Sequence, residues 1–421
     1  MRISVYFGEE GVFNRELDSD RVAIGSCEVS DEKKISVKQE LTERLVHPLE
    51  FPELYRSLVP GDRVVVAMDP KLPEADSIIP PVFDQFDIAG VRPSDVTLLC
   101  PVGNNNVSAR DPRGQLPSQW RNDVKWVTAD GKVEEQFRYL ANTAEGYRVY
   151  LNEYLVDADF VLPVSCLRYE FPDSYFGPHH VLYPSLSNES TQERCRVQTI
   201  SNSSKGDILR RAVGSGPKPV SVTDEANEVA WLLGVQFSIA AIVNRHGNCA
   251  HILAGETRAV FDQGKTDLDQ IWGRCYDRRS EVVICGLPGD DSEQTAASLV
   301  SALSSAQRLV STGGTIIMLT EISEIDRSGF QLFSEASEPH QVQTLFHDDM
   351  PAEEIFYAER IADVVSSARV YLRSSLEPRL VEDMFMIPLQ SLSEVDHLLS
   401  HDHSINILND AQHVRPVVKK G

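Results

Sequence analysis

The amino-acid sequence predicts a two-domain, layered α/β protein, and three observations lead to that prediction. The chain has 421 residues, about three times a common domain length, so we expect more than one hydrophobic core. Hydrophobic residues make up 42% and charged residues 24%, a composition typical of globular proteins. Short β-branched segments alternate with helical patterns, as they do in βαβ units.

The alternation is clearest in the N-terminal half. Four segments are predicted to be parallel strands: Asp62–Asp69, Asp95–Gly103, Asp123–Thr128 and Ala158–Ser165. Two segments have apolar residues at helical spacing: Glu50–Leu58 and Ile78–Ile88. A hairpin at the sheet edge is predicted where a polar, Gly-containing loop separates two apolar runs, Val235–Val243 and Ala250–Ala254. An amphipathic stretch, Gly255–Arg274, follows this hairpin.

A smaller α/β domain is predicted after residue 278. Its strands are expected at Glu281–Cys285, Thr315–Leu319 and Val370–Arg373. Its helices are expected at Ser292–Ser311 and Ala352–Ser367. A last helix, Leu392–Ser400, and strand, Ile405–Leu408, come near the C-terminus. We expect an N-terminal domain over residues 1–270, completed by 401–421, and a C-terminal domain over 278–400.

The charge of the chain argues against several classes of partner. Sixty-three acidic and forty basic residues give a formal net charge of −23, which repels nucleic acid and anionic membrane surfaces. The N-terminus lacks the apolar region of a signal peptide, so we expect a cytoplasmic protein. The seven cysteines are scattered without a C-x-x-C pair, and this spacing indicates neither a disulfide framework nor a zinc site.

Polar residues follow the predicted strands, at the edge where open α/β sheets bind ligands. Asp69 follows one strand, Asn104-Asn-Asn106 follows another, and a long polar segment starts at Arg168. Asp69 either caps the next turn or contacts a ligand, and both interpretations stay open. The asparagines are either ordinary turn residues, or their side-chain amides donate hydrogen bonds to a carboxylate ligand. His179 and His180 are adjacent and point in different directions, which makes His180 alone the better metal-ligand candidate.

The same segments resemble the lactate racemase family along most of the chain. Asp62–Pro73 resembles the family strand that ends Asp-His-Thr-Arg-Pro, and Pro101–Asn106 resembles Ala-Thr-Gly-Phe-His-Arg. Val161–Pro184 aligns without gaps to the family stretch that contains Gly-Gly-Arg-Lys-Ser-Val-Leu-Pro and keeps Gly177. Gly313–Met318 matches the family motif letter for letter.

This resemblance implies a catalytic site in a cleft between two domains, in which Gln294 contacts the substrate. The family transfers a hydride at C2 of a 2-hydroxy acid with a nickel pincer nucleotide, and two histidines move the hydroxyl proton. Here Asn105 and Glu170 occupy the two histidine positions, while His179 and His180 replace an Arg-Lys pair whose lysine carries the cofactor. An imidazole cannot form that amide-type linkage, so we expect any such cofactor to be non-covalent.

Two functions remain in competition. The first is a racemase or epimerase acting at C2 of a small anionic hydroxy acid. In that site Glu170 would act as the base, Asp69 and Asn105 would orient the substrate, Gln294 would hold its carboxylate, and Gly177 and the histidine pair would face the cofactor. The second is a non-catalytic protein that binds an anion or a partner on the same scaffold, since a fold does not determine a function.

Overall fold

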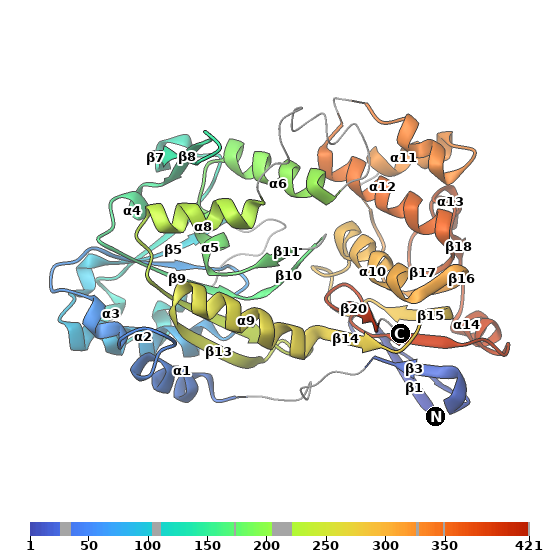
Figure 1. Ribbon diagram of the computed structural model, residues 1–421, viewed down its shortest axis with the longest axis horizontal. Helices are drawn as coiled ribbons and strands as arrows, with labels where there is room; N and C mark the ends of the chain where they lie inside the picture. Colours follow the sequence, from blue (N-terminus) through green and yellow to red (C-terminus); the bar gives the residue numbers. More distant parts are fainter. Residues whose placement is uncertain are drawn as a thin grey trace. The chain divides into compact units, whose positions relative to one another are not determined.

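The computed structural model describes residues 1–25, 35–102, 111–171, 174–203, 221–325, 328–347 and 350–419. The chain forms two compact units, each a layered α/β structure, and the α/β class predicted from the sequence is confirmed. Unit 1 comprises Met1–Glu28, Ile200–Gly216 and Trp272–Gly421, and unit 2 comprises Val29–Thr199 and Pro217–Ile271. Figure 1 shows the elements of both units. None of the helices in the described ranges is both long enough and apolar enough to cross a bilayer.

Unit 2 is built on a six-stranded sheet. The strand order is β13 (Cys249–Glu256), β12 (Phe237–Val243), β9 (Phe160–Cys166), β4 (Val64–Met68), β5 (Val96–Pro101) and β6 (Lys125–Ala129). All neighbours pair in parallel except the edge strand β13, which forms the predicted hairpin with β12. The carboxyl ends of β4 and β9 are therefore adjacent, and the segments that follow them meet at one edge of the sheet.

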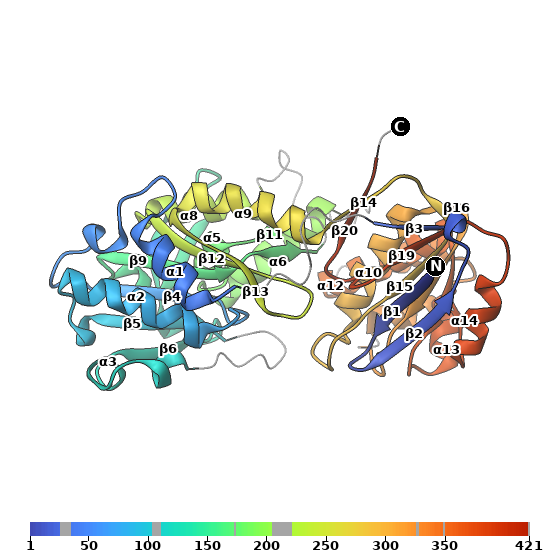
Figure 2. The same cartoon turned by 90° about the horizontal axis from the view of Figure 1, so that it is seen from below.

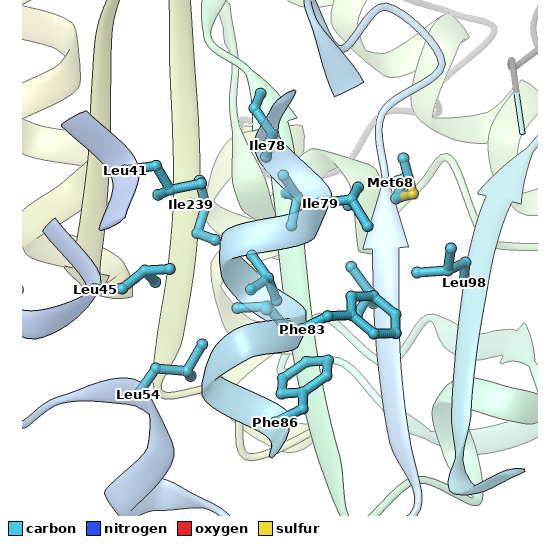
Figure 3. Packing of buried hydrophobic residues seen from close by; sticks show 14 of the residues in the cluster. Leu41, Leu45, Leu54, Met68, Ile78, Ile79, Phe83, Phe86, Leu98 and Ile239 are labelled. Carbon is cyan, nitrogen blue, oxygen red and sulfur yellow. The ribbon is translucent and has the colours of Figure 1, made fainter. Parts of the chain in front are cut away.

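Helices cover both faces of this sheet. One face packs against α1 (Val37–Val46) and α2 (Ala75–Ala89), and Figure 3 shows Phe83 and Ile79 of α2 turned towards Met68 of β4. The other face packs against α5 (Pro178–Leu182) and α8 (Val222–Leu232). Strands β4, β5 and β9 are buried on both faces, which is why they appear in the sequence as continuous apolar runs.

Unit 2 also contains the following elements, of which α6 and α9 have their last residues in unit 1. They are η2 (Leu54–Ser57), η3 (Pro93–Asp95), η5 (Pro112–Gln115), α3 (Ser118–Arg121), η6 (Glu134–Gln136), β7 (Phe137–Asn142), β8 (Arg148–Asn152), α4 (Glu153–Val156), β10 (Arg168–Glu170), β11 (Ser174–Phe176), α6 (Glu189–Ser203) and α9 (Thr257–Trp272). The helix predicted over Glu50–Leu58 is only the short η2, because Pro52 disfavours helix at the preceding residue. The long polar segment that starts at Arg168 contains β10, β11 and α5 in its described part.

Unit 1 contains a second sheet of six strands, all parallel. The order is β18 (Ile387–Pro388), β17 (Arg369–Arg373), β16 (Val310–Leu319), β15 (Ser280–Gly286), β19 (Ile405–Leu408) and β3 (Val22–Ile24). One face packs against the hairpin β1 (Arg2–Phe7) and β2 (Gly11–Glu16) and against α14 (Leu392–Leu399). Helices α10 (Ala296–Leu309) and α12 (Ala352–Ser367) pack on the other face, as Figure 2 shows.

The second sheet corrects the expected domain boundaries. Strand β19 lies between β15 and β3, so this strand extends the second sheet, and the C-terminal segment belongs to unit 1 instead of completing the N-terminal domain. The start of the chain belongs to the same unit. Pairing between strands nearly 400 residues apart in the sequence leaves no local pattern to predict it from. The remaining elements of unit 1 are η1 (Ser19–Arg21), β14 (Gly273–Tyr276), α11 (Ser328–Glu335), η7 (Pro339–Thr344), α13 (Pro378–Asp383) and β20 (Arg415–Val418).

Candidate functional site

Asp69 is the polar centre of the carboxyl edge of the first sheet, directly after β4. Its side chain is fully buried. Oδ2 accepts a hydrogen bond from the backbone N–H of Cys166 at 3.0 Å and one from Nη1 of Arg168 at 2.5 Å. Oδ1 accepts a hydrogen bond from the backbone N–H of Lys71 at 2.9 Å. Asp69 therefore ties the ends of β4 and β9 together and anchors a guanidinium beside them.

Arg168, at the start of β10, is the residue whose importance the sequence did not reveal. Its Nη1 also donates to the carbonyl oxygen of Cys166 at 2.9 Å, and its guanidinium carbon lies 3.7 Å from the ring centroid of Phe176. Burial opposes the charge, but Asp69 and its neighbours together raise the pKa of Arg168. Within the described ranges, no side chain or carbonyl accepts a hydrogen bond from Nε or Nη2, and the side chain is 27% exposed. Nε and Nη2 form one planar edge of the guanidinium, which is suited to bidentate binding of a carboxylate.

The hairpin that carries Arg168 is held against helix α9. Strands β10 and β11 pair Arg168 with Phe176 and Glu170 with Ser174. Tyr169, between the two charged residues, donates its hydroxyl to Oδ1 of Asp269 on α9 at 2.5 Å. Because side chains alternate along a strand, Tyr169 points away from the face that Arg168 and Glu170 share.

Glu170 lies at the end of β10 with its side chain exposed. Desolvation by the surrounding chain raises the pKa of its carboxyl, and the positive charges of Arg168 and Lys71 oppose this rise without reversing it. Because the side chain is exposed, the carboxylate is accessible to a ligand. A carboxylate of raised pKa on the same strand face as an arginine can accept a proton from a bound ligand.

His180 has a structural role in the start of α5. The backbone N–H of Gly177 donates to its Nδ1 at 3.2 Å, so the neutral ring carries its proton on Nε2 and donates to Oγ1 of Thr223, also at 3.2 Å. Burial, together with the nearby His179 and Arg168, lowers the pKa of His180 to about 3. The ring therefore stays neutral and links the cap of α5 to α8.

His179 is also held by two hydrogen bonds. Its Nδ1 lies 2.7 Å from Oδ1 of Asn227 and its Nε2 lies 2.6 Å from Oγ1 of Thr257. Burial lowers the pKa of His179, although the hydrogen bond to Asn227 opposes this change. Gly177, expected to face a cofactor, packs tightly here, because a Cβ atom added to it would lie 2.7 Å from the ring of Phe261.

Two candidates remain, Asn105 and Gln294. Asn105 lies outside the described residues. Gln294 belongs to unit 1, and its amide is occupied by the chain itself. Its Nε2 donates to the carbonyl oxygens of Leu287 at 3.1 Å and Gly289 at 3.2 Å, and its Oε1 accepts from Oγ1 of Thr320 at 2.6 Å. These bonds tie the loop after β15 to the end of β16, so Gln294 shapes the carboxyl edge of the second sheet.

The described residues do not fit a tethered nickel pincer nucleotide. His180, expected as a cofactor contact and metal ligand, has both ring nitrogens in hydrogen bonds inside a buried cap. His179 has both nitrogens engaged as well. No group of three or more His, Cys, Asp or Glu side chains in the described ranges is arranged to hold a metal ion.

Comparisons with known proteins agree with the fold and with the sequence resemblance. The family described as "Lactate racemase N-terminal domain" matches residues 9–206. The structure is similar to the lactate racemase apoprotein from Thermoanaerobacterium thermosaccharolyticum, with a TM-score of 0.77, 16% sequence identity and coverage of 100% of both chains. It is also similar to a protein from Thermotoga maritima, with a TM-score of 0.59, 11% identity and coverage of 94% of this chain and 100% of that one. A comparison with curated proteins gave no match.

These findings define a two-sheet α/β protein with the fold of the solved lactate racemase apoprotein. Residues 9–206 match the lactate racemase N-terminal domain, and the whole chain shares the fold of the solved lactate racemase apoprotein. The likeness extends over the full length of the solved apoprotein.

Proposed function

We propose that this protein is an isomerase of the lactate racemase family that acts at C2 of a small 2-hydroxy acid. The proposal rests on two side chains that share one strand face. Within the described ranges, Nε and Nη2 of Arg168 donate to no side chain or carbonyl, and the carboxylate of Glu170 is exposed on the same face. A 2-hydroxy acid offers a carboxylate for Nε and Nη2 of Arg168 and a hydroxyl for Glu170. The spacing of carboxylate and hydroxyl on adjacent carbons suits two residues that are neighbours on one strand face.

In this proposal each residue has one task. Arg168 binds and orients the substrate carboxylate, and Asp69 fixes the guanidinium so that little side-chain entropy is lost on binding. Glu170 accepts the hydroxyl proton as C2 changes oxidation state and returns it afterwards, for which its raised pKa is favourable. Lys71 adds positive charge beside Glu170 and draws the anionic substrate into the site.

The family resemblance implies a nickel pincer nucleotide, which would supply the hydride acceptor. We propose that any such nucleotide binds this chain without a covalent bond, because His180 replaces the attachment lysine and is committed to the cap of α5. Intact mass of the native protein tests this, and a mass increment equal to the cofactor would contradict it.

Both ring nitrogens of His179 and of His180 are occupied by hydrogen bonds within the chain, and this favours a second function. If no hydride acceptor binds, the Arg168 edge still provides a site for a hydroxy-acid anion, and the protein is then a binding protein. The two functions separate when binding and turnover are measured on the same preparation. Binding without turnover, with and without added nickel pincer nucleotide, identifies the binding protein.

The experiment that tests the proposal combines two variants. Arg168→Lys keeps the charge beside Asp69 but loses the planar edge, so the KM for the hydroxy acid should rise about 10- to 100-fold. Glu170→Gln keeps the shape but cannot accept a proton, so kcat should fall about 10²–10⁴-fold while binding persists. Glu145→Gln, an exposed carboxylate in a turn of unit 2, is the matched control and should leave both parameters unchanged.

A further inference from the structure

Arg373 lies at the carboxyl edge of the second sheet and leaves one edge of its guanidinium open. It is the last residue of β17, and its side chain is partly buried. Nη1 donates to the carbonyl oxygen of Thr320 at 3.1 Å, and the guanidinium carbon lies 5.1 Å from the ring centroid of Phe7. Within the described ranges, Nε and Nη2 have no acceptor, and no carboxylate pairs with Arg373. The open edge can therefore bind a carboxylate through two hydrogen bonds, at the place where parallel α/β sheets bind ligands.

Glu321 offers a carboxylate beside this arginine. It comes two residues after the end of β16 and is partly buried. A Cβ atom added to Gly8 would overlap its carboxylate, so that carboxylate rests against the backbone of Gly8. Gly8 directly follows Phe7, whose ring packs against the guanidinium of Arg373, so the two charged groups are neighbours. In the part of the chain that the structure describes, no ion pair or hydrogen bond engages the carboxylate of Glu321, and both charges are available to a ligand.

Hydrogen bonds fix the backbone around these two groups. The N–H of Gly8 donates to the carbonyl oxygen of Leu287 at 2.9 Å, and the carbonyl oxygen of Gly8 accepts from the N–H of Gly289 at 2.9 Å. The N–H of Glu321 donates to Oε1 of Gln294 at 3.0 Å. These bonds tie the end of β1 and the end of β16 to the loop after β15. A ligand that binds here would therefore order little of the chain.

The charges at this edge favour a ligand that carries both signs. Two acidic side chains of the loop after β15 are held by the chain itself, since Asp290 accepts two hydrogen bonds from a serine two positions on and Glu293 pairs with His413 at 3.1 Å. Arg373 and Glu321 present one positive and one negative charge side by side. A ligand that is only anionic would be attracted by the guanidinium and repelled by the carboxylate of Glu321.

We propose that Arg373 and Glu321 bind a small α-amino acid, with its carboxylate on Arg373 and its ammonium group on Glu321. In an α-amino acid the two charged groups are attached to one carbon, which suits receptor charges that are neighbours without forming an ion pair. Both contacts are charge-assisted hydrogen bonds. The two residues lie in unit 1, so the site does not depend on the function proposed for Arg168 in unit 2.

Calorimetric titration of the whole protein tests the assignment with three probes. L-Alanine carries both charges, propionate keeps only the carboxylate, and ethylammonium keeps only the cation. We expect saturable binding of alanine and binding of the other two that is weaker by about 10-fold or more, because each loses one charged hydrogen-bonded contact. Propionate bound as tightly as alanine would overturn the assignment, and so would the absence of saturable alanine binding.

Four variants locate the binding. Glu321→Gln keeps the shape and removes the charge, and alanine should bind it and Arg373→Gln about 10- to 100-fold more weakly than the natural chain. Glu382→Gln, which removes the same charge from an exposed position of α13, is the matched control and should bind alanine normally. Arg168→Lys should also bind alanine normally, because Arg168 belongs to unit 2. Alanine affinity that is unchanged in Glu321→Gln, or lost in Arg168→Lys, would show that this edge of unit 1 is not the site.

Discussion

Replacing Asp69 by asparagine should destabilise unit 2 much more than the same change at an exposed ion pair. Asp69 is fully buried and accepts three hydrogen bonds, one of them from Arg168. An asparagine keeps the shape but has one amide group, which must face either the backbone N–H of Lys71 or the donors from Cys166 and Arg168. A donor then faces a donor, and the guanidinium loses its counter-charge.

The expected loss follows from the burial of the pair. Removing one partner of a buried pair costs about 3–5 kcal/mol, and since Arg168 is 27% exposed we expect about 3 kcal/mol. Asp159→Asn is the matched control, because Asp159 pairs with Arg63 at 3.0 Å with both side chains largely exposed, where a pair contributes about 0–1 kcal/mol.

Urea unfolding followed by tryptophan fluorescence measures both changes. Three of the four tryptophans, Trp120, Trp126 and Trp231, lie in unit 2, so the signal reports mainly on that unit. The reasoning is refuted if the free energy of unfolding falls by the same amount in Asp69→Asn and Asp159→Asn.

Two further predictions concern the residues around α5. The pKa of His180 is about 3 in the folded chain and near 6.5 when unfolded, so the unfolded state binds the extra proton between these values. Above about pH 6.5 the neutral ring makes its full contribution to the free energy of unfolding. This contribution decreases as the pH falls towards 3, by up to about 1.4 kcal/mol per pH unit. His180→Gln, which can still accept from Gly177, should flatten this part of the stability curve, and an unchanged pH dependence would argue against a buried neutral ring. Gly177→Ala should lower the free energy of unfolding by about 1–3 kcal/mol, because its Cβ would lie against Phe261. Gly114→Ala is the control and should lower it by at most about 0.5 kcal/mol, because a Cβ there meets nothing within 4 Å. Equal melting temperatures of the two variants would contradict this packing.

Local patterns in the sequence predicted most elements of both sheets. The helix Ala352–Ser367 was predicted with the bounds that the structure has, because its apolar residues recur at helical spacing. The strands β4, β5 and β9 were predicted from their apolar runs. These signals depend only on neighbouring residues, so one sequence contains them fully.

The organisation of the candidate site depends on contacts that are distant in the sequence. Asp69 and Arg168 are separated by 99 positions, and His180 and Thr223 by 43. The sequence therefore identified Asp69 and His180 as polar residues after strands without revealing that one anchors an arginine and the other caps a helix. Arg168 carried one usable signal, its position two residues beyond the end of β9 at the edge where ligands bind.

The central claim is that Arg168 and Glu170 bind and deprotonate a small 2-hydroxy acid. The most direct measurement incubates single enantiomers of such acids, starting with lactate, with the natural chain and with Glu170→Gln, and follows the opposite enantiomer by chiral chromatography. Reactions are run with and without nickel pincer nucleotide. The proposal predicts that the natural chain forms the opposite enantiomer and that Glu170→Gln forms it about 10²–10⁴-fold more slowly. Equal rates for the two proteins, or no inversion of any acid by the natural chain, would contradict it.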